Sequence, residues 1–163
     1  MLNPTCPDLL RAIIANMDEV VLPQLEGPHA LSAGKNIKLL LAHVIYRLEH
    51  EGESLATDNA EKRSVLATLT ERAGASELRA RLDGIPDAGR YVRVEDLAVE
   101  AIRLRELAVD ASLYVHHNAA TLGAAATAEC LGPLRAQLRA QLDRDSAAVS
   151  HLSPAEIYDH KGV

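Results

Sequence analysis

The stretch from Asn36 to Gly52 most constrains the fold, because it is amphipathic in two different ways. A helix turns by about 100° per residue, so apolar residues three and four apart share one face. This spacing is shown by Ile37, Leu40, Leu41, Val44, Ile45 and Leu48. The opposite side carries His43, Tyr46 and His50, with Leu39 among them. We therefore predict a helix with one core face and a second, mixed face that makes another contact.

Composition extends the helical prediction to the whole chain. The 163 residues include no Phe, no Trp and only four Tyr, and Leu and Ala dominate. Both are strong helix formers, and Ala lets helices approach closely. A chain of this length fits one domain, residues 1–163. We predict an all-α fold, an up-and-down helical bundle of four main helices with additional short helices.

Turn and capping residues divide the chain. Asp58 has Glu61 three residues on, which is the spacing of a capping box at a helix start, and Gly52 and Gly74 are candidate helix ends. We predict helices over residues 7–22, from the Gly27-Pro28 turn to Gly52, 58–73, 76–82 and 95–117. Residues 119–130 continue the last of these or start another, with Gly123 as the weak point. A Leu stripe follows at 131, 134, 138 and 142, and Ser153 predicts a short terminal helix.

Charge and segment composition exclude several partners. The net charge is −6 and no basic patch stands out, which argues against nucleic acid and against an anionic membrane surface. No apolar run approaches the roughly 20 residues that span a bilayer, and no signal peptide is evident. Cys6 and Cys130 make no disulfide framework and are expected to be reduced thiols. We predict a cytoplasmic protein without nucleic-acid or membrane partners.

A second polar stripe follows the helix predicted over residues 95–117: Arg103, Glu106, Asp110, Tyr114 and His117. If this stripe faced His43, Tyr46 and His50 in an antiparallel arrangement, a proton-transfer site would form. His43 or His50 would be the base, and Asp110 would orient it. Tyr46 or Tyr114 would donate to a developing oxyanion, and His117 would approach His43.

Two other interpretations of these residues remain open. Glu106 and Asp110 are four residues apart and could hold a metal ion together with His50, although no established metal motif is present. Alternatively, the charged residues form ordinary surface ion pairs, and the histidines are solvated or lie in a subunit interface. We predict no cofactor, since no glycine-rich phosphate loop occurs.

The amino-terminal third resembles an uncharacterised family of small helical bacterial proteins, often encoded beside aminoglycoside-phosphotransferase-like kinases and acyl-CoA dehydrogenases. The similarity rests on these residues: Asp8 to Ile13, Val21-Leu22-Pro23 with Leu25, Gly27-Pro28, then Ala42, Val44, Glu49 and Gly52. Residues 107–110 also resemble a segment near the end of that family. The resemblance implies a bacterial cytoplasmic protein in small-molecule or acyl-group metabolism, and it implies no functional residues.

These observations support two classes of function. The first is a non-catalytic helical accessory or small-ligand-binding protein, with a small organic ligand or a metabolic enzyme as partner. The second is a cofactor-free enzyme that uses the His/Asp/Tyr set for proton transfer. The excess apolar surface of the 36–52 and 95–117 helices also predicts a homodimer.

Overall fold

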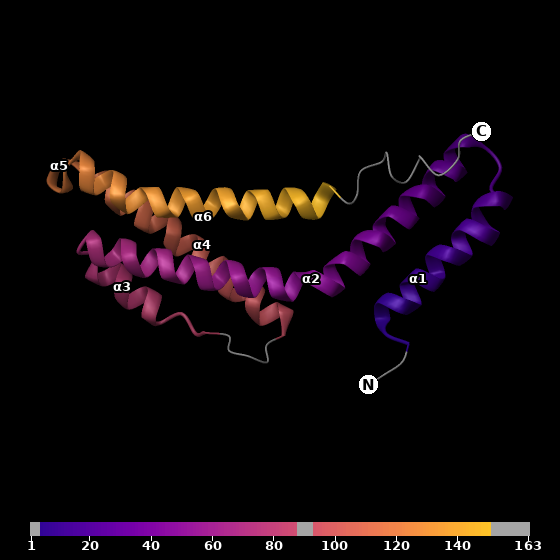
Figure 1. Ribbon diagram of the computed structural model, residues 1–163, viewed down its shortest axis with the longest axis horizontal. Coiled ribbons are helices and arrows are strands. Elements are labelled where there is room, and N and C mark those ends of the chain that lie inside the picture. The colour runs from indigo at the N-terminus through magenta and orange to yellow at the C-terminus, as the bar shows by residue number, and fades with distance from the viewer. Residues whose placement is uncertain (1–3, 88–92, 151–163) are drawn as a thin grey trace. The chain divides into compact units, whose positions relative to one another are not determined.

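The computed structural model describes residues 4–87 and 93–150, the last three by backbone alone, and most of these residues are helical (Figure 1). Four long helices are α1 (Cys6–Asn16), α2 (Pro28–Arg72), α4 (Val94–His117) and α6 (Ala124–Ser150). Two short ones are α3 (Ser76–Asp83) and α5 (Ala119–Leu122). These ranges contain no strand, which confirms the predicted all-α fold with four main helices.

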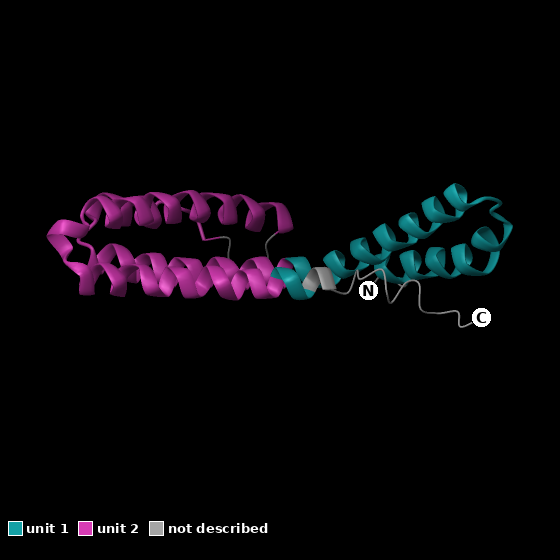
Figure 2. Cartoon of the chain, turned by 90° about the horizontal axis from the view of Figure 1, so that it is seen from above, with its two compact units in different colours: residues 1–51, 145–163 teal, residues 52–144 magenta. Residues whose placement is uncertain are grey.

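The chain divides into two compact units, which Figure 2 colours separately. Unit 1 comprises residues 1–51 and 145–163, and unit 2 comprises residues 52–144. Whether they form one domain, as the sequence predicts, stays a prediction. The helix predicted to begin at Ser153 lies outside the described residues.

Unit 1 contains a hairpin of α1 and the first half of α2. Thr5 caps α1: its side chain accepts from the Asp8 N–H at 3.4 Å, and its own N–H donates to the Asp8 carboxylate at 3.0 Å. Hydrogen bonds from the Thr5 side chain and backbone lower the pKa of Asp8. Two ion pairs join the helices, Arg11 with Glu49 at 2.5 Å and Lys38 with Asp18 at 2.7 Å. Their order along the chain makes the two helices antiparallel.

The turn between these helices depends on a close approach at Gly34. Helical backbone continues after α1 as a π-turn over Met17–Val21 and a 3₁₀ turn over Leu22–Gln24, so it ends close to the predicted end at residue 22. A Cβ at Gly34 would lie 2.6 Å from Leu22 Cδ2 and 2.9 Å from Leu25 Cδ1. An added Cβ would therefore require the Leu22 and Leu25 side chains to move away from α2.

The prediction of two helices between residues 28 and 73 was wrong, since α2 is continuous over Pro28–Arg72. Glycine inside a helix costs only about 1 kcal/mol relative to Ala, so Gly52 does not have to end it. Asp58 does not cap a helix start, because its carboxylate binds Arg144 of α6. The role of Asp58 is therefore determined by Arg144, which is far away along the chain, and not by the local spacing of a capping box.

Unit 2 has an aliphatic core to which α2, α3, α4 and α6 all contribute. Leu66 and Leu104 have no exposed surface, and Leu82 and Leu134 are 4% exposed. The remaining buried members are Leu69, Ala73, Ala75, Leu78, Leu107, Ala108, Ala111, Val115, Cys130 and Leu131. This composition agrees with the Leu-and-Ala packing expected from the sequence.

The apolar stripe of the 36–52 helix is not the core face that the sequence predicts. Ile45 is 7% exposed, but Ile37, Leu40, Val44 and Leu48 are exposed by between 43% and 63%. Periodicity predicts that a face will be buried but does not identify the surface that covers it. In this chain α1 covers only one edge of the stripe.

Other boundaries agree with the sequence. α3 and α4 match the predicted helices within one residue at each end, and Gly123, with φ of +82°, separates α5 from α6. In the predicted Leu stripe of α6, Leu131 and Leu134 are buried, but Leu138 and Leu142 are 42% and 64% exposed. The helix therefore buries only part of that stripe.

Gly52 and Gly74 provide a matched test of the continuous helix. A Cβ at Gly52 would meet Val94 Cγ2 at 3.7 Å, an ordinary contact, whereas Gly74 has a φ of +63°. We expect Gly52→Ala to raise the free energy of unfolding by about 0.5–1 kcal/mol, and Gly74→Ala to lower it by about 1 kcal/mol. Urea denaturation measures both. Destabilisation by Gly52→Ala would contradict an uninterrupted α2.

Candidate functional site

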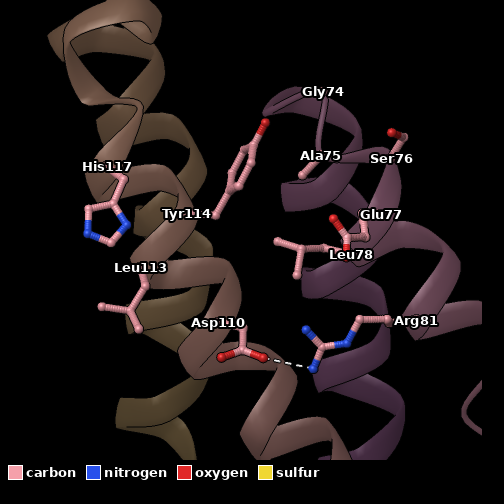
Figure 3. A pocket seen from close by; sticks show the side chains of 10 residues that line it. All are labelled: Gly74, Ala75, Ser76, Glu77, Leu78, Arg81, Asp110, Leu113, Tyr114 and His117. Carbon is pink, nitrogen blue, oxygen red and sulfur yellow. Dashed lines mark hydrogen bonds and ion pairs between the residues drawn. The ribbon is translucent and has the colours of Figure 1, made fainter.

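A pocket of about 450 Å³ lies in unit 2 between the turn after α2, α3 and the second half of α4 (Figure 3). Its lining consists of Gly74, Ala75, Ser76, Glu77, Leu78, Arg81, Asp110, Leu113, Tyr114 and His117. Three of the six predicted catalytic residues therefore line one cavity: Asp110, Tyr114 and His117. They share a face of α4 because they are four and three residues apart.

The turn at Gly74 shapes the rim of this pocket. The Gly74 N–H donates to the Glu71 carbonyl at 3.2 Å, and the Ala75 N–H donates to the Thr70 carbonyl at 2.9 Å. This pair of bonds is a Schellman motif, which requires the left-handed backbone that Gly74 supplies. The chain reverses there, so that α3 begins beside α4 and supplies Ser76, Glu77 and Arg81 to the pocket.

Asp110 binds an arginine that the sequence analysis did not associate with it. The Arg81 guanidinium of α3 donates to the Asp110 carboxylate at 2.7 Å (Figure 3). Both side chains are nearly half exposed, so the pair contributes at most about 1 kcal/mol to stability. Its main effect is to neutralise Asp110 and to fix it at one end of the pocket.

Tyr114 and His117 differ in how they line the cavity. Figure 3 shows the half-buried Tyr114 ring extending from α4 toward the Gly74 turn. His117 is exposed, and its imidazole lies farther from α3. The pocket is therefore a partly open surface site with a phenol on one wall, the Arg81–Asp110 pair at one end, and Leu78 and Leu113 as its largest aliphatic side chains.

The other predicted catalytic residues, His43, Tyr46 and His50, lie in unit 1 on α2. The Tyr46 and His50 rings are 4.6 Å apart between centroids and tilted by 48°. His43 is half-buried, and its Nδ1 atom is buried without a hydrogen-bond partner in the described structure. Asp110 belongs to unit 2, so the predicted site that would bring these three residues to Asp110 stays a prediction.

The metal hypothesis involves residues of both units, since His50 lies in unit 1 and Glu106 and Asp110 in unit 2. Among the described residues, no group of three or more His, Cys, Asp or Glu side chains is arranged to hold a metal ion.

Cys6 is exposed and Cys130 is buried, and both are free thiols.

The sequence analysis missed a buried polar network that joins α2 to α4. Glu100 of α4 is 5% exposed and accepts from Arg63 Nε at 2.6 Å and from Asn59 Nδ2 at 3.2 Å. Asn59 also donates to the Leu97 carbonyl at 3.0 Å. Arg63 reaches the backbone of the segment after α3 as well, where it donates to the Ile85 carbonyl at 3.0 Å.

A second part of this network joins α2 to α6. Arg144 donates to the Glu61 carboxylate at 2.6 Å and also to that of Asp58. The hydrogen bond from Arg144 to Glu61 is the main cause that raises the pKa of Arg144 above its usual value. Lys62 and Gln137 are also buried, at 2% and 6% exposure. Apart from Ala60, every residue from Asp58 to Arg63 is polar, and the sequence analysis assigned only a capping role to Asp58 and Glu61.

Comparison with known proteins adds no further constraint: no family model, curated protein or solved structure matches the chain. The resemblance of the amino-terminal third therefore stays a prediction. No helix within the described ranges is both long and apolar enough to cross a membrane.

The network yields a test that separates buried from exposed carboxylates on one helix. We expect Glu100→Ala to lower the free energy of unfolding by about 3 kcal/mol, because it removes the buried carboxylate that accepts from both Asn59 and the half-buried Arg63. The matched control is Glu106→Ala on the exposed side of α4, which we expect to change it by no more than about 0.5 kcal/mol. Urea denaturation gives both values, and equal effects would contradict a structural role for Glu100.

Proposed function

We propose that this protein is a non-catalytic accessory protein that binds a small organic ligand in the α3–α4 pocket. The observation that carries the proposal is the composition of that pocket, which combines charged and hydroxyl side chains with Leu78 and Leu113. Its volume of about 450 Å³ falls within the roughly 300–1,000 Å³ of typical small-molecule sites. No described histidine is hydrogen-bonded to a carboxylate, which favours binding over acid–base chemistry.

The charges of the pocket indicate the class of ligand. Arg81 already neutralises Asp110, whereas Glu77 has no ion-pair partner among the described side chains. The unpaired carboxylate favours a basic nitrogen, and the face of the Tyr114 ring can add a cation–π contact. Leu78 and Leu113 offer surface for an apolar body. A small amine with a short hydrocarbon portion fits this set of groups.

Three broader features belong to the same proposal. The resemblance of residues 8–52 supports a bacterial protein that acts in small-molecule metabolism beside a metabolic enzyme. The negative charge and the two free cysteines support a cytoplasmic location. The exposed apolar residues of α2 support the homodimer that the sequence predicts.

Amide NMR shifts of the full chain test ligand binding. The probes are n-hexylamine and benzylamine, with hexanoate and phenylacetate as anions of matched size. We expect the amines to shift residues 74–81 and 110–117 saturably, and the anions to bind at least fivefold more weakly. Removing the carboxylate with Glu77→Gln should weaken amine binding about tenfold, the usual loss for a charged hydrogen bond.

The control for this experiment is Glu129→Gln on α6, whose side chain is 70% exposed and lies outside the pocket. It should leave the amine affinities unchanged. If neither amine shifted the pocket residues, or if Glu77→Gln bound them as tightly as the unaltered protein, this ligand class would be wrong.

One observation favours an enzyme as the second candidate: Asp110, Tyr114 and His117 line the same pocket. In that case His117 would act as the base and Tyr114 as the hydrogen-bond donor to a developing oxyanion. Given a retained ligand identified by native mass spectrometry, we expect His117→Ala to lower its turnover at least 100-fold while its binding is kept. Turnover that is absent from the unaltered protein, or unchanged in His117→Ala, would eliminate this candidate.

A further inference from the structure

We propose that the α1–α2 hairpin of unit 1 binds a second copy of this chain through one apolar face, so that two hairpins form a four-helix bundle. This hairpin face consists of Leu9, Ile13 and Val20 from the α1 side and Ile37, Leu40, Val44 and Leu48 from α2. The proposal specifies the surface of the predicted homodimer. It does not depend on ligand binding in the α3–α4 pocket.

All seven residues of the hairpin face are large aliphatic side chains exposed to solvent. The exposed fraction ranges from 43% at Val44 to 63% at Leu40. Together they expose an area on the order of 600 Å², against roughly 800 Å² buried by each partner in an interface of standard size. The largest apolar patch on a typical monomer is about 300–600 Å² and is often functional, so the hairpin face lies at the upper end of that range. The area is therefore close to what a stable dimer requires.

The two stripes lie on the same side of the hairpin. On α1, the exposed residues Leu9 and Ile13 directly precede Leu10 and Ile14, which are half-buried. On α2, the exposed Val44 directly precedes the buried Ile45. Viewed along each helix from its N-terminus, the exposed stripe therefore lies about 100° from the side that faces the other helix. The sense of this rotation is the same for both helices. Because the helices are antiparallel, equal rotations bring both stripes to one side.

The opposite side of the hairpin is polar. Arg11 and Asp18, which pair with Glu49 and Lys38, directly follow the inward residues Leu10 and Met17. They are therefore turned away from the hairpin face. The hairpin has one apolar and one charged side, as does half of a four-helix bundle.

The hairpin buries too little surface to be stable by itself. Within the described part of unit 1, only Met17, Gly34 and Ile45 are buried, and α1 contributes no buried residue. Ordering two helices costs about 1–2 kcal/mol per residue in backbone entropy, which burial of a few side chains cannot offset. The exposed stripes are the apolar surface that remains to stabilise it.

A second copy fits this face better than an oppositely charged protein or a lipid surface. None of its seven residues is charged, so two copies can meet there without repulsion even though the chain carries a net charge of −6. Helices that lie on membranes have polar faces rich in Lys and Arg, whereas the polar side of this hairpin pairs Arg11 with Glu49 and Lys38 with Asp18. An identical aliphatic face provides a complementary surface, and twofold symmetry is the most common way to pair such faces.

Light scattering of the full chain across a concentration series tests the proposal. We expect a dimer for the unaltered protein and a melting temperature that rises with concentration. Val44→Glu, which places a charge within the hairpin face, should raise the dimer dissociation constant at least 100-fold. Val44→Ala keeps the helix-forming tendency and removes apolar surface, so it should raise the constant about tenfold even if Val44→Glu unfolds the hairpin.

Matched controls place the same charge on other exposed aliphatic positions. Ile102→Glu on α4 and Leu142→Glu on α6 alter residues that are 53% and 64% exposed, outside the hairpin face. Both should leave the dimer intact. A protein that is monomeric at every concentration would overturn the proposal. So would a dimer that survives Val44→Glu, or one that Ile102→Glu or Leu142→Glu dissociates while Val44→Ala has no effect.

Discussion

Charged side chains in the middle of α2 hold the helices of unit 2 in register. Arg63 binds Glu100 of α4, and Asp58 and Glu61 bind Arg144 of α6. A core of Leu and Ala stabilises helix packing but is tolerant of shifts along the helix axis, since its contacts are non-directional. Hydrogen bonds between these wholly or partly buried charged groups are directional, and a shift along the helix axis would leave them unsatisfied. The polar network therefore selects one alignment among those that the aliphatic core would permit.

The candidate pocket depends on this alignment. Arg63 also binds the carbonyls of Ile85 and Pro86, so it fixes the end of α3 as well as α4. The Gly74 turn fixes the beginning of α3. With both ends held, Arg81 lies opposite Asp110, and the side chains of α3 and α4 line the partly open cavity in Figure 3. The candidate pocket is thus a consequence of packing in unit 2, whose residues form all of its lining.

Local signals predicted what depends on local structure. The helix end predicted at Gly74 and the weak point predicted at Gly123 both have the positive φ that favours glycine, and the helices predicted over 76–82 and 95–117 are α3 and α4. The continuity of α2 could not be predicted in this way. Asp58 and Glu61 have the spacing of a capping box, but three residues is also the separation that brings two carboxylates to one face of a helix. Only Arg144, more than 80 residues along the chain, distinguishes the two roles. For the same reason, the sequence did not indicate that Glu100 would be buried. Glu is almost never buried unless it has a partner, and the partners of Glu100 are far from it along the chain.

The candidate site shows the same limit. Asp110, Tyr114 and His117 come together because one helix face is a local property, whereas the binding of Asp110 by Arg81 depends on how α3 packs against α4. The stripe of Ile37, Leu40, Val44 and Leu48 is a further case. Its periodicity predicts burial, but burial in a core and burial between subunits require the same residues at the same spacing. Burial in the core and burial between subunits are distinguished by the amount of apolar surface that stays exposed after α1 has packed against α2. That remainder is the hairpin face, and its size is the reason to expect a second copy there.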